Sequence, residues 1–117
     1  MPVLILTSDL LLQSQLAGAA GRAECTVESA TTVESLLERA NDARPELVCL
    51  DLSHAGLDPA SVVPQVKQAT PSATIVAFAP HVHRQRLAAA EQAGCDVVLS
   101  RGQFHADMES LLREHAG

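Results

Sequence analysis

Residues 45–58 read PELVCLDLSHAGLD. The apolar run 47–50 leads directly to the carboxylate of Asp51. A short run of this kind is typical of a strand in a parallel sheet, because helices cover both faces of such a sheet. The stretch therefore predicts a buried strand whose carboxyl end presents Asp51.

Similar strand segments recur on both sides of this stretch, and helical patterns separate them. Apolar runs stand at 3–6, 74–78 and 97–99, and residues 23–28 alternate apolar and polar side chains, which indicates a half-exposed edge strand. The first helix is expected to begin at a cap, Ser8 or Asp9, and to end at Gly21. A capping box at 31–34 predicts the start of the second, and Gly94 closes a helix over 83–93. The last helix shows an apolar stripe at Phe104, Met108, Leu111 and Leu112.

Pro64 sets the expected start of the helix that follows the quoted stretch. A proline is tolerated in the first turn of a helix, where its missing N–H has no partner to lose. We therefore expect Ser61 to cap this helix, so that Pro64 falls in its first turn.

Strictly alternating strands and helices predict right-handed crossovers and a parallel sheet. The dinucleotide-binding and flavodoxin-like orders both satisfy this pattern. Five units and the polar edge at 23–28 favour an α/β flavodoxin-like (βα)5 three-layer sandwich, with a parallel five-stranded sheet of order 2-1-3-4-5, in one domain over 1–117. Ligand chemistry in such folds gathers at the carboxyl ends of the strands. The residues expected there are Thr7, Ser8, Asp9, Asp51, His54, Ala79, His81, Ser100 and Arg101.

Composition excludes several classes of function. The net charge of −6 argues against nucleic-acid binding, which needs a basic face. Residues 7–15 contain no glycine, which argues against a phosphate-cradling loop and hence against a nucleotide or flavin enzyme. No apolar run reaches the length of a membrane span, and the first residues lack the basic region of a signal peptide. The unpaired pattern of Cys25, Cys49 and Cys95 indicates reduced thiols and a cytoplasmic setting.

Three segments in register resemble the response-regulator receiver family (CheY-like). Residues 45–58 resemble its signature, in which a phospho-accepting aspartate ends the third strand, and this position is Asp51. Residues 7–12, TSDLLL, match the acidic segment after the first strand, and 92–96, QAGCD, resemble the run before the fifth strand. The resemblance implies a non-enzymatic domain of two-component signalling or a phosphorelay.

The chain departs from this family at most positions that carry the chemistry. The adjacent carboxylates that hold Mg²⁺ fall on Thr7 and Ser8, and Asp9 stands one residue late. The other departures are a hydroxyl replaced by Ala79, a switch aromatic replaced by Val98 and a lysine replaced by Arg101. We therefore expect a pseudo-receiver, in which Mg²⁺ binds weakly, phosphorylation of Asp51 is weak or lost, and the fold is kept for contacts with a signalling protein.

Other interpretations stay open at this point. In one alternative, Asp51 is a working phosphoacceptor with an atypical metal site. In another, its side chain only caps the following turn. A small metal-binding α/β protein that uses His54, His81 and His83 is a third alternative.

The resemblance also implies a partner surface made by the fourth helix, the fifth strand and the fifth helix. An ordinary solvated face is the alternative interpretation of the same residues. The side chains expected on this surface are His83, Arg84, Arg86, Gln103, His105 and Glu109.

Overall fold

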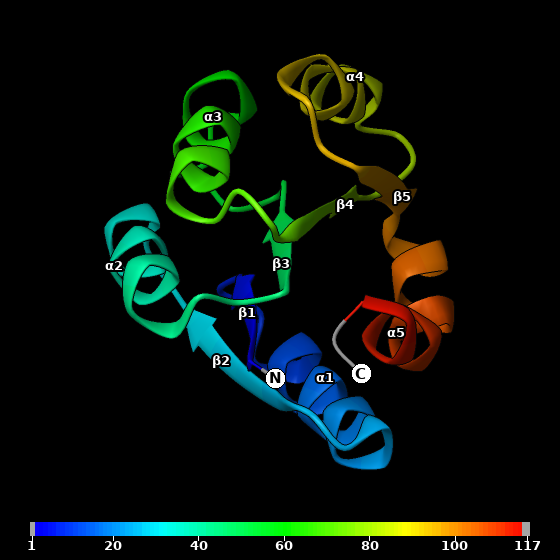
Figure 1. Cartoon of the computed structure of the whole chain (residues 1–117). Helices are drawn as coiled ribbons and strands as arrows, with labels where there is room; N and C mark the ends of the chain where they lie inside the picture. Colours follow the sequence, from blue (N-terminus) through cyan, green and yellow to red (C-terminus); the bar gives the residue numbers. More distant parts are fainter. Residues whose placement is uncertain (1, 116–117) are drawn as a thin grey trace.

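The computed structural model describes residues 2–115, which form a parallel five-stranded sheet between two layers of helices (Figure 1). The sheet order β2-β1-β3-β4-β5 confirms the flavodoxin-like prediction. The strands are β1 Pro2–Leu6, β2 Thr26–Ala30, β3 Leu47–Asp51, β4 Thr74–Ala79 and β5 Val97–Ser100. The helices are α1 Leu10–Ala23, α2 Val33–Ala43, α3 Pro59–Ala69, α4 Arg84–Ala93 and α5 Arg101–His115.

The two faces of the sheet bury separate apolar cores. Helices α1 and α5 cover one face, and α2, α3 and α4 cover the other (Figure 1). Every residue of β3 is buried, as the apolar run before Asp51 predicts. With few aromatic residues in the chain, one stacked pair stands out in the first core, where the rings of Phe78 and Phe104 lie 4.0 Å apart at 8°.

The predicted boundary between α1 and β2 is wrong. Gly21 does not end the helix, which continues to Ala23, and β2 therefore starts at Thr26 rather than at residue 23. Ala20 and Ala23 are both buried in the core below α1, and this burial favours one further turn. The reversal falls on Glu24, whose φ of 59° lets its N–H bond the carbonyls of Ala20 and Gly21.

The start of α3 also differs from the prediction. The helix begins at Pro59, so Ser61 is not its cap and Pro64 lies in the helix interior. An interior proline costs about 3 kcal/mol, because it removes one backbone hydrogen bond and crowds the preceding turn. Val62, Val63 and Val66 of this helix are buried in the core, and burial of three valines outweighs that cost. The ring of Pro64 faces solvent.

The remaining helix signals are close to their predicted positions. Asp9 caps α1, and its side chain accepts from Leu12 N–H. Thr32 caps α2, one residue beyond the start of the expected capping box at 31–34. Gly94 ends α4 with a φ of 103°, as expected. No helix within residues 2–115 is long and apolar enough to cross a membrane.

The stacked aromatic pair should dominate the stability of the α1/α5 side. We expect Phe104→Ala to lower the free energy of unfolding by about 3–5 kcal/mol, because it removes buried ring area and leaves a cavity. Leu10→Ala, at a side chain that is 77% exposed, should change it by less than about 0.5 kcal/mol. Urea denaturation of both variants measures the difference, and equal losses would contradict this account of the core.

Candidate functional site

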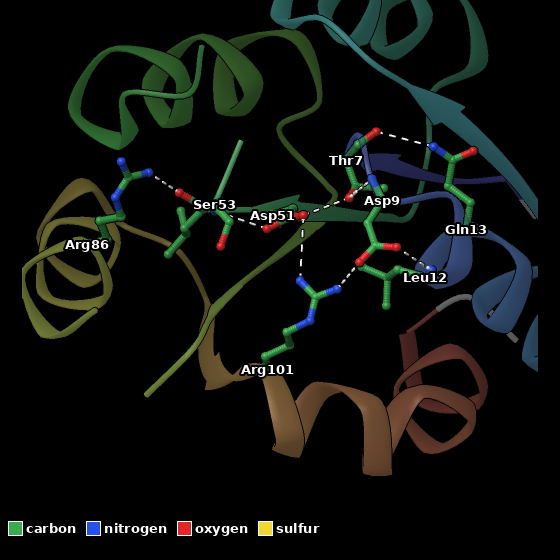
Figure 2. Close-up of polar contacts among 9 residues, drawn as sticks. Thr7, Asp9, Leu12, Gln13, Asp51, Ser53, Arg86 and Arg101 are labelled. Carbon is green, nitrogen blue, oxygen red and sulfur yellow. Dashed lines mark hydrogen bonds and ion pairs between the residues drawn. The ribbon is translucent and has the colours of Figure 1, made fainter. Parts of the chain in front are cut away.

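Three elements bring polar side chains together at the carboxyl edge of the sheet. Asp51 ends β3 and is 3% exposed, and the buried Thr7 follows the neighbouring strand β1. Arg101 begins α5, directly after β5, and its side chain reaches back toward both strands (Figure 2). The site therefore depends on the parallel register, which aligns the ends of β1 and β3.

Both oxygens of the Asp51 carboxylate have partners. Oδ2 accepts a hydrogen bond of 2.7 Å from the Thr7 hydroxyl, and Oδ1 accepts one of 3.0 Å from Ser53 N–H. Nη1 of Arg101 lies 3.9 Å from Oδ2. No buried side-chain N or O atom in the described part of the chain lacks a hydrogen-bond partner, and each oxygen of this carboxylate has one within the protein.

Asp9 is committed to two structural contacts. Its Oδ1 accepts from Leu12 N–H at 3.1 Å as the cap of α1, and its Oδ2 forms an ion pair with Nη2 of Arg101. The hydrogen bond from Leu12 lowers the pKa of Asp9, partial desolvation opposes this shift, and the charge of Arg101 adds to the lowering. The guanidinium of Arg101 thus bridges the carboxylates of Asp9 and Asp51 (Figure 2).

This set of donors does not fit Mg²⁺. The ion requires near-octahedral oxygen ligands, which carboxylates usually supply together with water. Here Arg101 occupies the space between the two carboxylates, and the Thr7 proton points at Oδ2 of Asp51. Ser8 is exposed. Within residues 2–115, no group of three or more His, Cys, Asp or Glu side chains is close enough to hold a metal ion.

The loop after Asp51 is attached on both sides. Nη1 of Arg86, on α4, donates to the carbonyl oxygen of Leu52. The ring of His54 contacts the β2–α2 turn, with Nε2 2.5 Å from the Thr31 carbonyl oxygen. Nδ1 of the same ring accepts from Gly56 N–H at 3.1 Å. Contacts to α4 and to the β2–α2 turn therefore fix the conformation of residues 52–57.

The structure gathers only part of the predicted site. Thr7, Asp9, Asp51 and Arg101 meet, whereas the three histidines do not form a cluster. His81 and His83 are exposed, and the ring of His54 points to the β2–α2 turn. Ala79 is buried at the end of β4, and Val98 is half-buried on β5.

The structure also changes the predicted partner surface. Glu109 does not lie on the α4 side of α5, because it forms an ion pair of 2.5 Å with Arg22 of α1. His105 lines the same groove between α1 and α5. Sequence spacing places both residues on α5 but says nothing of which neighbouring helix they face.

Sequence reasoning missed three contacts in and near the site. Gln13 donates to the Thr7 carbonyl oxygen at 3.3 Å, the backbone of Ser53 bonds Asp51, and Arg86 bonds Leu52. A turn residue two positions after an aspartate is a known local signal for the Ser53 contact. The contact of Arg86 joins segments 34 residues apart, and no local pattern marks it or the contact of Gln13.

No family model and no curated protein sequence matches the chain, but many solved structures share its fold. A response regulator from Burkholderia pseudomallei, with a phosphorylated aspartic acid and a calcium ion, is 21% identical over 95% of this chain and 64% of its own, with a TM-score of 0.80. The receiver domain of NtrX from Brucella abortus is 19% identical over 96% of this chain and 95% of its own, with a TM-score of 0.81.

A third structure is the receiver domain of a sensor histidine kinase from Pseudomonas aeruginosa, which has magnesium in its active-site cleft. It is 15% identical over 97% of this chain and 95% of its own, with a TM-score of 0.81. The chain spans 64% of the Burkholderia regulator and 29% of a longer NtrX structure. The chain therefore has the fold of response-regulator receiver domains.

The Thr7 hydroxyl should stabilise the buried carboxylate. We expect Thr7→Val to lower the free energy of unfolding by about 1.5–3 kcal/mol, because Asp51 loses a charge-assisted hydrogen bond that water cannot replace. Ser8→Ala removes the neighbouring, exposed hydroxyl and should cost less than about 0.5 kcal/mol. Chemical denaturation separates the two, and a near-neutral Thr7→Val would show that the contact adds no stability.

The contacts of His54 define its tautomer. Nε2 must carry a proton to donate to the Thr31 carbonyl, and Nδ1 must be unprotonated to accept from Gly56 N–H. We expect ¹⁵N NMR to show that neutral His54 is the Nε2–H tautomer. A predominant Nδ1–H form would contradict the attachment of this loop to the β2–α2 turn.

Proposed function

We propose that this chain is a receiver-fold signalling module that a protein partner reads without phosphorylation of Asp51. One observation carries the proposal: the guanidinium of Arg101 bridges Asp9 and Asp51. In the receivers that the sequence resembles, this region holds a metal ion and accepts a phosphoryl group. The guanidinium of Arg101, which is part of the chain, takes the place of the exchangeable metal ion.

Asp51 is a poor nucleophile in this arrangement. Each oxygen of Asp51 accepts one hydrogen bond, and these bonds together with the charge of Arg101 stabilise the carboxylate and so lower its nucleophilicity. Phosphoryl transfer also depends on positive charge that neutralises the transferred group. The single guanidinium of Arg101 already serves two carboxylates, so the site has an excess of negative charge before any phosphoryl group arrives.

The groups that would respond to a phosphoryl group are also replaced. Such a group adds roughly −1.5 to −2 of charge at neutral pH, and a switch needs side chains that move toward it. Ala79 has no hydroxyl, and Val98 is a small aliphatic side chain in place of an aromatic one. The loop over 52–57 is already fixed by Arg86 and His54. These features support a domain with one stable state.

We also propose a non-enzymatic role, as the resemblance to receiver domains implies. Cys49 is not a candidate nucleophile, since burial raises the pKa of its thiol to about 12. Burial also raises the pKa of Cys95, to about 11. Three free cysteines, without a disulfide among them, support a cytoplasmic setting, and we propose a signalling protein as the partner.

Reaction with a small phosphodonor tests this proposal. We expect acetyl phosphate and Mg²⁺ to add no phosphoryl mass to the wild-type chain, while an intact receiver treated in parallel is labelled. A variant with Thr7→Asp, Ser8→Asp, Ala79→Thr and Arg101→Lys should gain the label, because it restores the metal ligands, the hydroxyl and the lysine.

The control is Asp51→Asn in the restored variant, which should abolish the label. Circular dichroism of each variant confirms that the fold is kept. Stoichiometric labelling of the wild-type chain that Asp51→Asn removes would overturn the proposal and identify a working phosphoacceptor with an atypical site.

A further inference from the structure

A basic segment joins β4 to the first turn of α4. Residues 81–86 read HVHRQR, and every one of them is exposed. Val82 is 68% exposed and is one of the few large apolar side chains on the described surface. This basic segment, 81–86, follows the carboxyl end of β4, so it lies at the same edge of the sheet as Asp51.

Charge is unevenly distributed along the chain. No aspartate or glutamate stands between Asp58 and Glu91, although the whole chain has a net charge of −6. One group of acidic side chains lies at the other edge of the sheet, on β2 and α2. Exposed acidic residues there are Glu28, Glu34, Glu38 and Asp42. In an acidic molecule, the exposed segment 81–86 therefore has two arginines and no acidic residue.

The two arginines of the basic segment have no acidic partner within residues 2–115. The ion pairs of the described chain involve other residues, and Arg86 bonds the neutral carbonyl of Leu52. Both arginines lie in the first turn of α4, where the helix dipole disfavours cations. The positive charges bring no stability to the start of α4, and such local conflicts are typical of functional surfaces.

We propose that the basic segment is a docking surface for an acidic, partly apolar segment of a protein partner. This inference rests on the proposed function, since it names the chemistry of the partner. Carboxylates of the partner would face Arg84 and Arg86, and an apolar side chain would contact Val82. The contact between Arg86 and Leu52 holds α4 against the loop after Asp51, so the surface is formed before binding and binding orders little of the chain.

Charge favours a protein segment over a nucleic acid as the occupant. Nucleic-acid binding draws its affinity from many phosphate contacts, and this surface offers two arginines. The acidic helix α2 lies in the same layer as α4 and would repel an extended polyanion. A short acidic protein segment satisfies both conditions, because it needs few cationic contacts and does not extend to α2.

Peptide titration of the ¹⁵N-labelled chain tests the surface. The probe is a synthetic peptide of alternating glutamate and leucine, and a lysine–leucine peptide is the comparison. We expect chemical-shift changes at residues 81–86 with the acidic peptide alone. Arg84→Glu should weaken binding about 3- to 10-fold, because it turns an attraction into a repulsion.

Two further measurements separate binding from folding. Arg84→Glu should raise the midpoint of thermal unfolding by about 1–5 °C, because an acidic residue suits the first turn of a helix. The matched control is Arg44→Glu, the same charge change at an exposed residue near the opposite end of the strands. This variant should bind the acidic peptide as the wild-type chain does.

Several outcomes would overturn the inference. The first two are chemical-shift changes away from 81–86 and an equal loss of affinity in Arg44→Glu. A third is displacement of the peptide by a DNA duplex at equal concentration. The fourth is self-association in sedimentation that Arg84→Glu abolishes, because it would identify a second copy of the chain as the occupant. Repeating the titration with Asp51→Asn keeps the two proposals apart. Unchanged peptide binding agrees with both the proposed function and the docking surface. Phosphodonor labelling of Asp51 would overturn the proposed function, and the docking surface would then be judged by the peptide affinity of Arg84→Glu alone.

Discussion

The buried carboxylate of Asp51 is the constraint around which the site is built. A carboxylate that is 3% exposed must be paired and hydrogen-bonded, because the protein interior replaces little of its lost hydration. Thr7 from β1 and Ser53 from the following loop supply the hydrogen bonds, and Arg101 from α5 supplies the charge. Three separate segments are thereby tied to the end of the central strand.

Arg101 then gives Asp9 its role. The sequence presents Asp9 as an acid displaced by one position from a metal site, whereas the structure uses it as the cap of α1 and the second partner of Arg101. Cap and ion pair both favour the charged form, as the lowered pKa of Asp9 shows. One guanidinium thus links α1, β3 and α5 at the point where an intact receiver relies on a metal ion.

Sequence periodicity predicted the strands, their order and the residues at their carboxyl ends, because a buried parallel sheet requires continuous apolar runs. It failed where tertiary burial overrode a local signal. The burial of Ala23 outweighed the stop signal of Gly21, and the burial of Val62 and Val63 outweighed the cost of Pro64 in a helix. At the site, the sequence named Arg101 and Asp9 separately but could not pair them, since their contact depends on how α5 leaves the sheet.

Under the proposed function, the same network would let a receiver fold serve a partner without a switch. When a domain binds only in one of its conformations, its apparent affinity is reduced by the fraction of molecules that adopt that conformation. Here Arg101 fixes the site, while Arg86 fixes the loop after Asp51 against α4. Arg86 therefore belongs both to the site's surroundings and to the exposed basic segment at 81–86. In the proposal, a partner that docks there meets a surface that the contact of Arg86 with Leu52 already holds in place, so binding requires no costly change of state.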